Sequence, residues 1–277
     1  MGMGALFGRK SYTQRAVRQA KRFAFLSSSG IAAPVSGRCL LCGKEQLSFE
    51  FAGLCDECRG KITPNAGKTC EKCGRPLIAE ERFCETCREK ERHFDRAYSC
   101  YVYEDAARQL VTRFKYAKAL YIARQMAYDM AELYFTKDIS CSLIVPSPSS
   151  AERIKERGYD HIAVLTEFLR GIINIPVAYG AVVKGKDNKM QAGLGGVERE
   201  ENVLGVYSGG ENSGMLKGAH VLVVDDVLTT GATASEVAKV AKKFGAEEVK
   251  VLTFASTRYS AGFSGATPGR SGDTEGL

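Results

Sequence analysis

From about residue 100 onward, the chain alternates short apolar runs with longer stretches of helical spacing. The apolar runs predict strands over residues 142–146, 175–183, 219–226 and 248–256. Apolar residues recur at helical spacing over 159–171 and 231–244. A stretch without Gly or Pro, 106–135, predicts one long helix or two joined helices. Strands separated by helices indicate an α/β fold, a mostly parallel sheet with flanking helices.

Cysteines dominate the pattern between residues 38 and 94. Eight of the ten cysteines form four pairs with two intervening residues: Cys39 and Cys42, Cys55 and Cys58, Cys70 and Cys73, and Cys84 and Cys87. One such pair can bind a tetrahedral ion from a tight turn, and a second pair nearby completes a four-sulfur site. The spacing therefore predicts a small Cys-rich zinc-binding module with two structural Zn²⁺ sites.

The way in which the four pairs combine stays open at this point, and sequential pairing is a simpler hypothesis than crossed pairing. Closed four-cysteine sites support folding and docking rather than catalysis. Four repeated pairs also argue against a disulfide framework or a single redox pair. His93 could replace a ligand but is expected at a domain boundary, while Cys100 and Cys141 are expected in the core.

Positive charge is concentrated at the start of the chain, whose formal net charge is +7. Residues 1–35 contain no acidic residue and these basic ones: Arg9, Lys10, Arg15, Arg18, Lys21 and Arg22. Such an arm has three interpretations: contact with nucleic acid or an anionic membrane, a targeting segment, or a poorly ordered extension. No stretch reaches the roughly 18 consecutive apolar residues of a membrane helix, so we expect no transmembrane segment.

Composition predicts four parts of the 277-residue chain. They are a basic, disordered arm at 1–37, a double zinc-ribbon-like module at 38–94, an α/β domain at 95–258, and a disordered tail at 259–277.

A pair of acids follows the apolar run in the stretch "VLVVDDVLTTGATAS", residues 221–235. Ligands of parallel sheets bind at the carboxyl ends of strands, where Asp225 and Asp226 are expected. The next residues turn into a helix, so their N–H groups and the helix dipole can bind an anion. Acids that accept from ribose hydroxyls and attract Mg²⁺, beside donors for phosphate, predict a sugar-phosphate site. Its predicted ligand-binding residues are Asp225, Asp226, Thr229, Thr230, Gly231, Ala232 and Thr233.

This stretch resembles the signature of type I phosphoribosyltransferases, which bind 5-phosphoribosyl pyrophosphate, usually with Mg²⁺. The cysteine pairs, "FKYAKAL", "VPSPSSAERIKERGYDHIAVL", "KMQAGLGGVEREENVLGVYS" and the signature also resemble, in that order, the ComF family of competence-associated proteins. The resemblance spans about residues 38 to 256. It implies a zinc-finger module joined to a type I phosphoribosyltransferase-like fold, with a role in moving transforming single-stranded DNA into the bacterial cytoplasm.

Roles carried over from this resemblance extend the predicted site. Asp225 and Asp226 match the ribose-contacting acids, and residues 229–233 match the loop that holds the 5-phosphate. Residues 146–149, with Ser147 as a candidate ligand-binding residue, occupy the place of the pyrophosphate loop.

Two further segments match the family's pattern. Lys155 and Arg157 lie in its basic segment and are the candidate catalytic residues, with Arg157 as a pyrophosphate clamp. Residues 184–202 match a mobile lid, with these residues at its motif positions: Gln191, Arg199 and Asn202. The chain departs from the pattern at Asp160 and His161, where Asn-Gln is more common, and at Asn188, where Thr is common; we expect His161 to be a satisfied helix residue.

Two functional hypotheses follow from the sequence. In one, the protein is a cytoplasmic DNA-uptake factor, with peripheral membrane contact as an option, that binds 5-phosphoribosyl pyrophosphate or a related sugar phosphate. Its zinc module and basic arm would contact single-stranded DNA or proteins of the uptake machinery. In the alternative, it is an active phosphoribosyltransferase acting on a small-molecule acceptor. A zinc scaffold with a relic pocket is disfavoured by the intact "DDVLTTGAT".

Overall fold

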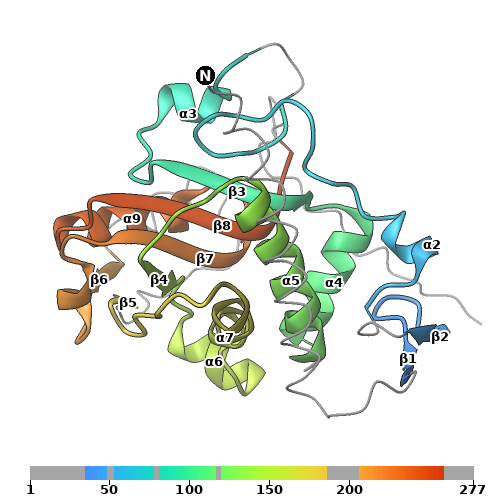
Figure 1. The fold of residues 1–277 in the computed structure, drawn as a ribbon. Helices are drawn as coiled ribbons and strands as arrows, with labels where there is room; N and C mark the ends of the chain where they lie inside the picture. The colour runs from blue at the N-terminus through green and yellow to red at the C-terminus, as the bar shows by residue number, and fades with distance from the viewer. Residues whose placement is uncertain (1–34, 49–52, 78–80, 117–119, 186–205, 259–277) are drawn as a thin grey trace, which may run out of the picture.

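The computed structural model describes residues 35–48, 53–77, 81–116, 120–185 and 206–258 (Figure 1). Almost the whole predicted basic arm, the tail and most of the predicted lid lie outside these residues. The lid residues outside the described part are Asn188, Gln191, Arg199 and Asn202. Among the described residues, no helix combines the length and apolar character needed to cross a bilayer.

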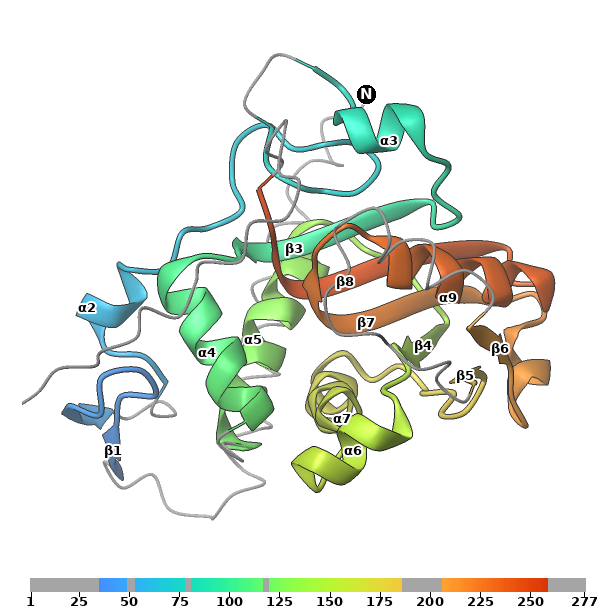
Figure 2. The same ribbon diagram turned by 180° about the vertical axis from the view of Figure 1, so that it is seen from behind.

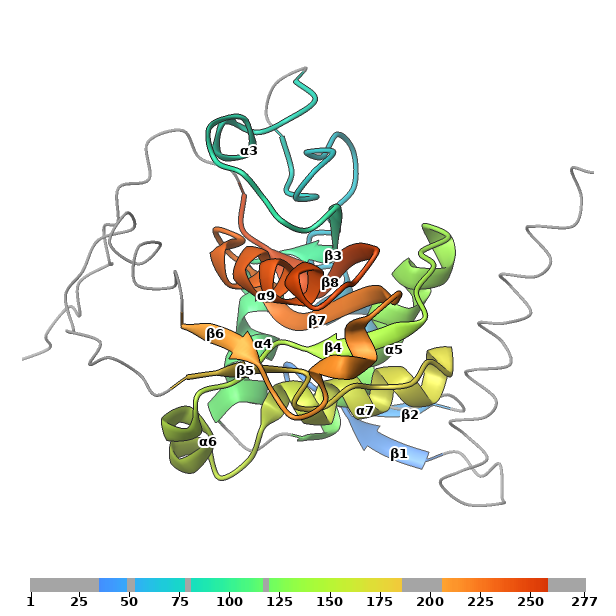
Figure 3. The ribbon, with the colours of Figure 1, turned by 90° about the vertical axis from the view of Figure 1, so that its left-hand side faces the viewer.

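A four-stranded sheet forms the centre of the α/β domain. Its strands are β3 (Arg96–Val102), β8 (Glu248–Ser256), β7 (His220–Leu228) and β4 (Leu143–Pro146), in this spatial order. Every neighbouring pair is parallel, and the order can be followed from top to bottom in Figure 3. The predicted mostly parallel sheet is therefore confirmed.

Helices cover both faces of this sheet. The helices on one face are α4 (Asp105–Tyr116), α5 (Leu120–Thr136) and α7 (His161–Ile173), whereas α9 (Ala232–Lys243) lies on the other. Figures 1 and 2 view the sheet from opposite sides, with α5 toward the viewer in Figure 1 and α9 in Figure 2. The short helix α6 (Ala151–Arg157) connects β4 to α7.

The predicted helical stretch 106–135 forms two helices, the joined pair that its pattern allowed. The predicted strand over 175–183 is wrong for most of its length. Only Val177 bridges β4 there, and a turn with positive φ at Gly180 ends the extended run. The residues that follow form β5 (Val182–Lys184), which pairs antiparallel with β6 (Tyr207–Gly209) in a separate sheet.

The two cysteine-rich modules are small and pack at different places. The first contains β1 (Val35–Arg38), β2 (Glu45–Ser48) and α2 (Asp56–Arg59), and lies beside α4 (Figure 1). The second contains α3 (Glu85–Glu89) and lies above β3 in the same view. A 3-10 helix at Ser213–Leu216 precedes β7.

Each module contributes to a different hydrophobic core. Leu40, Leu54 and Ile62 of the first module pack into the core that α4, α5 and α7 form with one face of the sheet. Arg113 of α4 donates to the Leu40 carbonyl at 2.9 Å. The second module's cysteines and Phe94 belong to the core on the α9 face. Neither module is an independent appendage, because both share buried residues with the α/β domain.

The segment between the modules is tied to the edge of the sheet. Pro64 forms an antiparallel bridge with Tyr101 of β3. The Asn65 side-chain amide donates to the carbonyls of Gly74 at 2.8 Å and Ser99 at 3.2 Å. This segment therefore holds the second module against β3 through hydrogen bonds that a loose linker would lack.

The two glycines that follow the CLLC and CEKC pairs provide a matched test of this docking. Gly43 and Gly74 have φ values of 74° and 68°. A Cβ on Gly74 would lie 2.3 Å from the Ala97 carbonyl oxygen, whereas one on Gly43 would meet nothing within 4 Å. We expect Gly43→Ala to cost about 1 kcal/mol of unfolding free energy from backbone strain. Gly74→Ala should cost at least about 2 kcal/mol more, because the module must move off β3.

Thermal unfolding of both zinc-loaded variants measures this difference. Equal losses would mean that the second module does not depend on its contact with β3.

Candidate functional site

Each group of four cysteines gathers its sulfur atoms in one place. Within each group, all Sγ atoms lie within 4.8 Å of one another. The groups combine the pairs sequentially: Cys39, Cys42, Cys55 and Cys58 in the first site, and Cys70, Cys73, Cys84 and Cys87 in the second. The structure thus confirms sequential pairing.

The geometry of both sites fits tetrahedral zinc. The sulfurs of Cys42 and Cys55 lie 3.8 Å apart, and those of Cys73 and Cys84 lie 3.6 Å apart. Four sulfurs at about 2.3 Å from a tetrahedral ion are about 3.8 Å apart. The Cys55 N–H also donates to the Cys39 sulfur at 3.4 Å, as expected for a knuckle turn. Both sites suit Zn²⁺ in a structural role.

Outside the two sites, His93 lies at a module boundary as predicted, whereas Cys100 and Cys141, predicted in the core, are half-buried at its margin. Among the described residues, Cys100 and Cys141 belong to neither metal cluster, and both pack against the first hydrophobic core. His93 is not in a cluster either. Its backbone N–H donates to the Ser235 hydroxyl at 3.1 Å, which places it where the second module meets α9.

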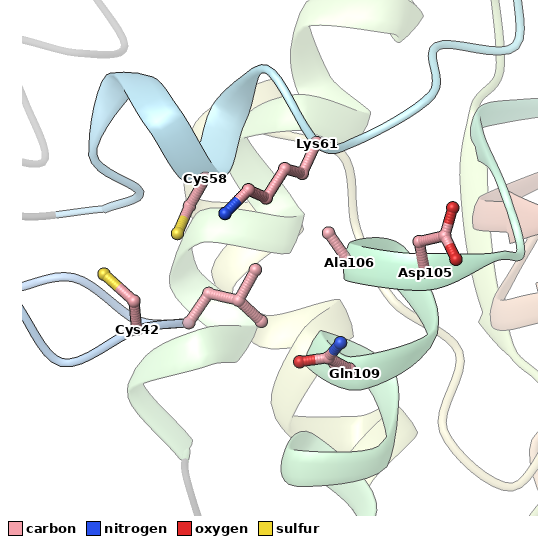
Figure 4. A pocket seen from close by; sticks show the side chains of 7 residues that line it. Cys42, Cys58, Lys61, Asp105, Ala106 and Gln109 are labelled. Carbon is pink, nitrogen blue, oxygen red and sulfur yellow. The ribbon is translucent and has the colours of Figure 1, made fainter.

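A cavity of about 440 Å³ lies beside the first zinc site (Figure 4). Cys42 and Cys58 lie on one side of it, and the start of α4 at Asp105 lies on the other. The predicted sugar-phosphate residues do not line this cavity. They lie in β7, in the loop that follows it and at the start of α9.

Strand register brings the predicted pyrophosphate loop next to the acid pair. Pro146 of β4 pairs with Val224 of β7. Ser147, the first residue after β4, therefore lies beside Asp225 of β7, near the carboxyl edge of the sheet. The Ser147 N–H donates to the Val224 carbonyl at 2.9 Å, and its hydroxyl hydrogen bonds with Asp225. The two candidate elements therefore lie side by side.

The loop after β7 has the form of an anion cradle. Helix α9 begins at Ala232, so the N–H groups of its first turn lack intrahelical acceptors. Gly231 precedes it with φ at 78°, a conformation that favours glycine. Thr229 and Thr230 are exposed and Thr233 is half-buried. Hydroxyl and N–H donors are thus presented together at a helix N-terminus.

Asp226 is buried and paired with two groups from the helical layer. Its Oδ2 atom lies 2.9 Å from Lys115 Nζ and 3.0 Å from His161 Nε2. Burial alone would raise the pKa of Asp226, but the His161 hydrogen bond and the charge of Lys115 outweigh it. The pKa is held below its usual value, so Asp226 stays ionised.

Asp225 has a different environment from its neighbour. It is half-buried, and its Oδ1 accepts the N–H of Asp226 at 2.8 Å. Burial and the charge of Asp226 raise the pKa of Asp225 to about 6. Within the described residues it forms no ion pair, in contrast to Asp226.

Arg157 is buried beside the same pair. It ends α6, and its Nη1 lies 2.9 Å from His161 Nδ1. A His161 tautomer with hydrogen on Nε2 satisfies both contacts, accepting from Arg157 and donating to Asp226. The guanidinium also lies 5.2 Å from the Tyr116 ring centroid. Its Nε is buried and has no hydrogen-bond partner within the described part of the chain.

The structure separates the remaining candidates. Lys155 is exposed and, in the described part of the chain, forms no hydrogen bond or ion pair with the acid pair, whereas Arg157 is linked to Asp226 through His161. The sequence analysis did not predict the ion pair of Lys115 with Asp226, although Lys115 lies in the family-like stretch "FKYAKAL".

His161 is a satisfied helix residue, as expected, and its hydrogen-bond partner is Asp226. Asp160 caps α7 by accepting from the N–H groups of the next turn.

Comparison with known families matches both parts of the chain. A model described as "Phosphoribosyl transferase domain" matches residues 162–269, and one described as "Double zinc ribbon domain" matches residues 33–88. Competence protein F of Haemophilus influenzae is 28% identical over 219 residues, covering 77% of this chain and 94% of the relative. The DNA utilization protein YhgH of Escherichia coli is 25% identical over 228 residues, covering 80% and 98%.

Solved structures of phosphoribosyltransferases are also similar to part of the chain. Purine phosphoribosyltransferase from Pyrococcus horikoshii is 20% identical, with a TM-score of 0.32, over 48% of this chain and 73% of that one. Hypoxanthine phosphoribosyltransferase from Trypanosoma cruzi, in complex with IMP, is 14% identical, with a TM-score of 0.29, over 54% and 65%.

The cysteine clusters predict metal content directly. We expect about two Zn²⁺ per chain, because each closed site holds one ion. Cys39→Ser and Cys70→Ser should each remove one ion from a different site. Elemental analysis of purified protein measures the ratio. One ion or none in the unaltered protein would contradict the two-site arrangement.

The two acids should respond oppositely to replacement by Asn. Asp226→Asn should lower the free energy of unfolding by about 2 kcal/mol at both acidic and neutral pH, because it weakens the contacts to Lys115 and His161. For Asp225, the folded pKa of about 6 lies above the ordinary 3.8. Stability is therefore lost as pH rises from about 4 through 6. Asp225→Asn should be more stable than the unaltered protein at neutral pH, with the difference shrinking toward about pH 4.

Thermal unfolding at both pH values gives the comparison. Equal effects of the two substitutions at each pH would show that the acids do not occupy different environments.

Proposed function

We infer that the chain belongs to a ComF-like family, which combines a double zinc ribbon with a phosphoribosyltransferase domain. From this premise, we propose that it binds 5-phosphoribosyl pyrophosphate or a related sugar phosphate. The ligand would lie at the carboxyl edge of β7 and β4. We further propose that this binding supports uptake of single-stranded DNA.

The juxtaposition of Asp225 with two sets of anion donors is the observation that carries this proposal. The ribose hydroxyls would donate to Asp225, the acid without a cation partner among the described residues. The 5-phosphate would accept from the loop at residues 229–233, at the start of α9. The pyrophosphate would lie toward Ser147, which is in hydrogen-bond contact with Asp225. One ligand with a phosphate at each end of a ribose matches this order of groups.

Arg157 supports a pyrophosphate group in particular. A buried guanidinium nitrogen without a partner costs free energy, and a ligand oxygen would remove that cost. The chain Asp226–His161–Arg157 holds the guanidinium in place through two hydrogen bonds. Lys115 adds a second positive charge beside the acids. In this proposal Asp226 positions these groups, while Asp225 contacts the ligand.

Mg²⁺ fits the same site. Carboxylate and phosphate oxygens are its preferred ligands. Of the two acids, Asp226 is paired with Lys115, so Asp225 would be the one that contacts the ion. When bound, the ion would neutralise charge on the pyrophosphate. The positive charges of Lys115 and Arg157 would contribute to the same neutralisation.

A transferase activity is the alternative, in which an acceptor attacks the anomeric carbon and pyrophosphate leaves. The arrangement around His161 favours binding over turnover. Both ring nitrogens of His161 are engaged, one by Arg157 and the other by Asp226, so the ring is not free to accept a proton from an acceptor.

The proposed role in DNA uptake draws on two observations. Two relatives that match this chain over almost their whole length are named competence protein F and DNA utilization protein. The chain also carries six basic residues and no acid in residues 1–35, a composition suited to a nucleic-acid backbone. We propose single-stranded DNA or proteins of the uptake machinery as partners of this arm and of the zinc ribbons, on the cytoplasmic side of the membrane.

Asp225→Asn tests the ligand assignment. Calorimetric titration with 5-phosphoribosyl pyrophosphate and Mg²⁺ should show an affinity about ten- to a hundredfold weaker than that of the unaltered protein. This is the range expected when hydrogen bonds to a charged group are lost. If uptake depends on the pocket, transformation frequency should fall with the affinity. Pyrophosphate release with candidate acceptors tests the transferase alternative in the same samples.

Asp138→Asn is the matched control. Asp138 is exposed, lies between α5 and β4 at the amino end of that strand, and has φ at 51°, which Asn tolerates. Its substitution should leave the affinity unchanged. Full binding by Asp225→Asn, or no binding by the unaltered protein, would overturn the proposal.

A further inference from the structure

A buried arginine side chain contacts both the second predicted zinc site and the loop at residues 229–233. Arg75 lies between Cys73 and the loop and is only 6% exposed. Its Nε is 3.4 Å from the Cys73 sulfur, and its Nη2 is 3.6 Å from the Cys84 sulfur. Its Nη1 donates to the Thr229 carbonyl at 3.2 Å. One guanidinium therefore contacts two predicted zinc ligands and the first residue of the cradle.

The chemistry of these contacts suits a rigid connection. Zinc-bound cysteines are thiolates, so a four-cysteine site carries negative charge that a guanidinium complements. Hydrogen bonds from outside the first ring of ligands orient metal-binding side chains. With zinc in the second site, the two sulfurs are held at fixed positions, and so is the planar Arg75 fork. Without it, the sulfurs are free to separate and the fork loses its support.

The Thr229 carbonyl is held from two directions. It accepts from Arg75 and also from the Thr257 hydroxyl at 3.2 Å. Because the peptide unit is planar and trans, fixing this carbonyl also fixes the N–H of Thr230, which points the opposite way. Because the Thr229 carbonyl faces the Arg75 guanidinium, that N–H is directed away from it. The orientation of a cradle donor thus depends on Arg75 together with Thr257.

Neighbouring contacts support the same part of the loop. A Cβ on Gly231 would lie 3.8 Å from the Phe94 ring, so this buried ring closes the loop from the ribbon side. The His93 N–H donates to Ser235 in the first turn of α9. The first zinc site packs instead against α4, through Arg113 and the Leu40 carbonyl. Only the second site, among the described residues, has a hydrogen-bonded route to the cradle.

We propose that Arg75 is a positioning residue that couples the second zinc site to the sugar-phosphate pocket. Occupancy of that site by zinc strengthens ligand binding, and the ligand in turn strengthens zinc binding there. The first zinc site is outside this coupling. The reciprocal part rests on the proposed function, whereas the link between the zinc site and the loop does not.

Zinc affinity gives the first test. In Cys39→Ser only the second site retains zinc, and in Cys70→Ser only the first does. At equilibrium with a competing chromogenic chelator, the second site should bind zinc about tenfold more tightly when 5-phosphoribosyl pyrophosphate and Mg²⁺ are present, because coupling between binding free energies is reciprocal. The zinc affinity of the first site should not change. Adding Arg75→Met to Cys39→Ser should abolish this effect of the ligand.

Hydrogen exchange of the zinc-loaded, ligand-free protein gives the second test. In Arg75→Met, the backbone amides of residues 229–235 should exchange about tenfold faster, because the loop loses its support. Arg75→Lys keeps the charge but cannot bridge three acceptors, so it should show a smaller increase of the same kind. Arg82→Met is the matched control, since Arg82 lies in the same module but is exposed and paired with Glu71. It should leave the loop unchanged.

The two tests separate the inference from the proposed function. If the unaltered protein binds no ligand but Arg75→Met still loosens residues 229–235, the proposed function fails and the structural coupling stands. If exchange in these residues is the same in Arg75→Met, Arg75→Lys and Arg82→Met, the coupling is overturned. An equal increase in the zinc affinity of both sites with ligand would also overturn it, because the effect would then be global.

Discussion

Two adjacent carboxylates within β7, near its carboxyl end, set the main electrostatic constraint in this molecule. Side by side and withdrawn from water, Asp225 and Asp226 cannot both stay charged without compensation. The charge of Asp226 is compensated by Lys115 from α4 and by a hydrogen bond from His161 of α7. The helical layer is thereby tied to the sheet at the point where the ligand is proposed to bind. Asp225, left without a cation, takes the raised pKa and the open position.

The same constraint explains the position of Arg157. His161 bridges Asp226 and the guanidinium, so a positive group is held near the acids without cancelling the charge of Asp225. A second buried arginine, Arg75, contacts the loop after β7 and the Cys73 sulfur. The proposed pocket thus has buried cations near it that are held by contacts within the protein. Such an arrangement would suit an anionic ligand, because its charges are positioned in advance.

The zinc ribbons are parts of this framework rather than appended modules. Small cysteine-rich segments bury too little apolar surface to fold by themselves, and metal binding supplies the missing stability. Here each ribbon gains further stability by sharing a core with one face of the α/β domain. The first ribbon completes the core around α4 and α5. The second completes the one beneath α9 and reaches the loop after β7 through Arg75.

The structural features that depend on residues close together in the sequence could be predicted from it. The cysteine spacing indicated two four-sulfur sites, and "VLVVDDVLTTGATAS" indicated paired acids near the carboxyl end of a strand and a turn into a helix, because both depend on residues close together in the chain. The strand itself continues two residues past the acids, to Leu228. The strand predicted over 175–183 failed where Gly180 turns the backbone. The partners that distinguish Asp226 from Asp225, and the link from Arg75 to Thr229, came only from the tertiary structure. They join residues far apart in sequence, so they are set by how helices and ribbons pack on the sheet, which no local pattern records.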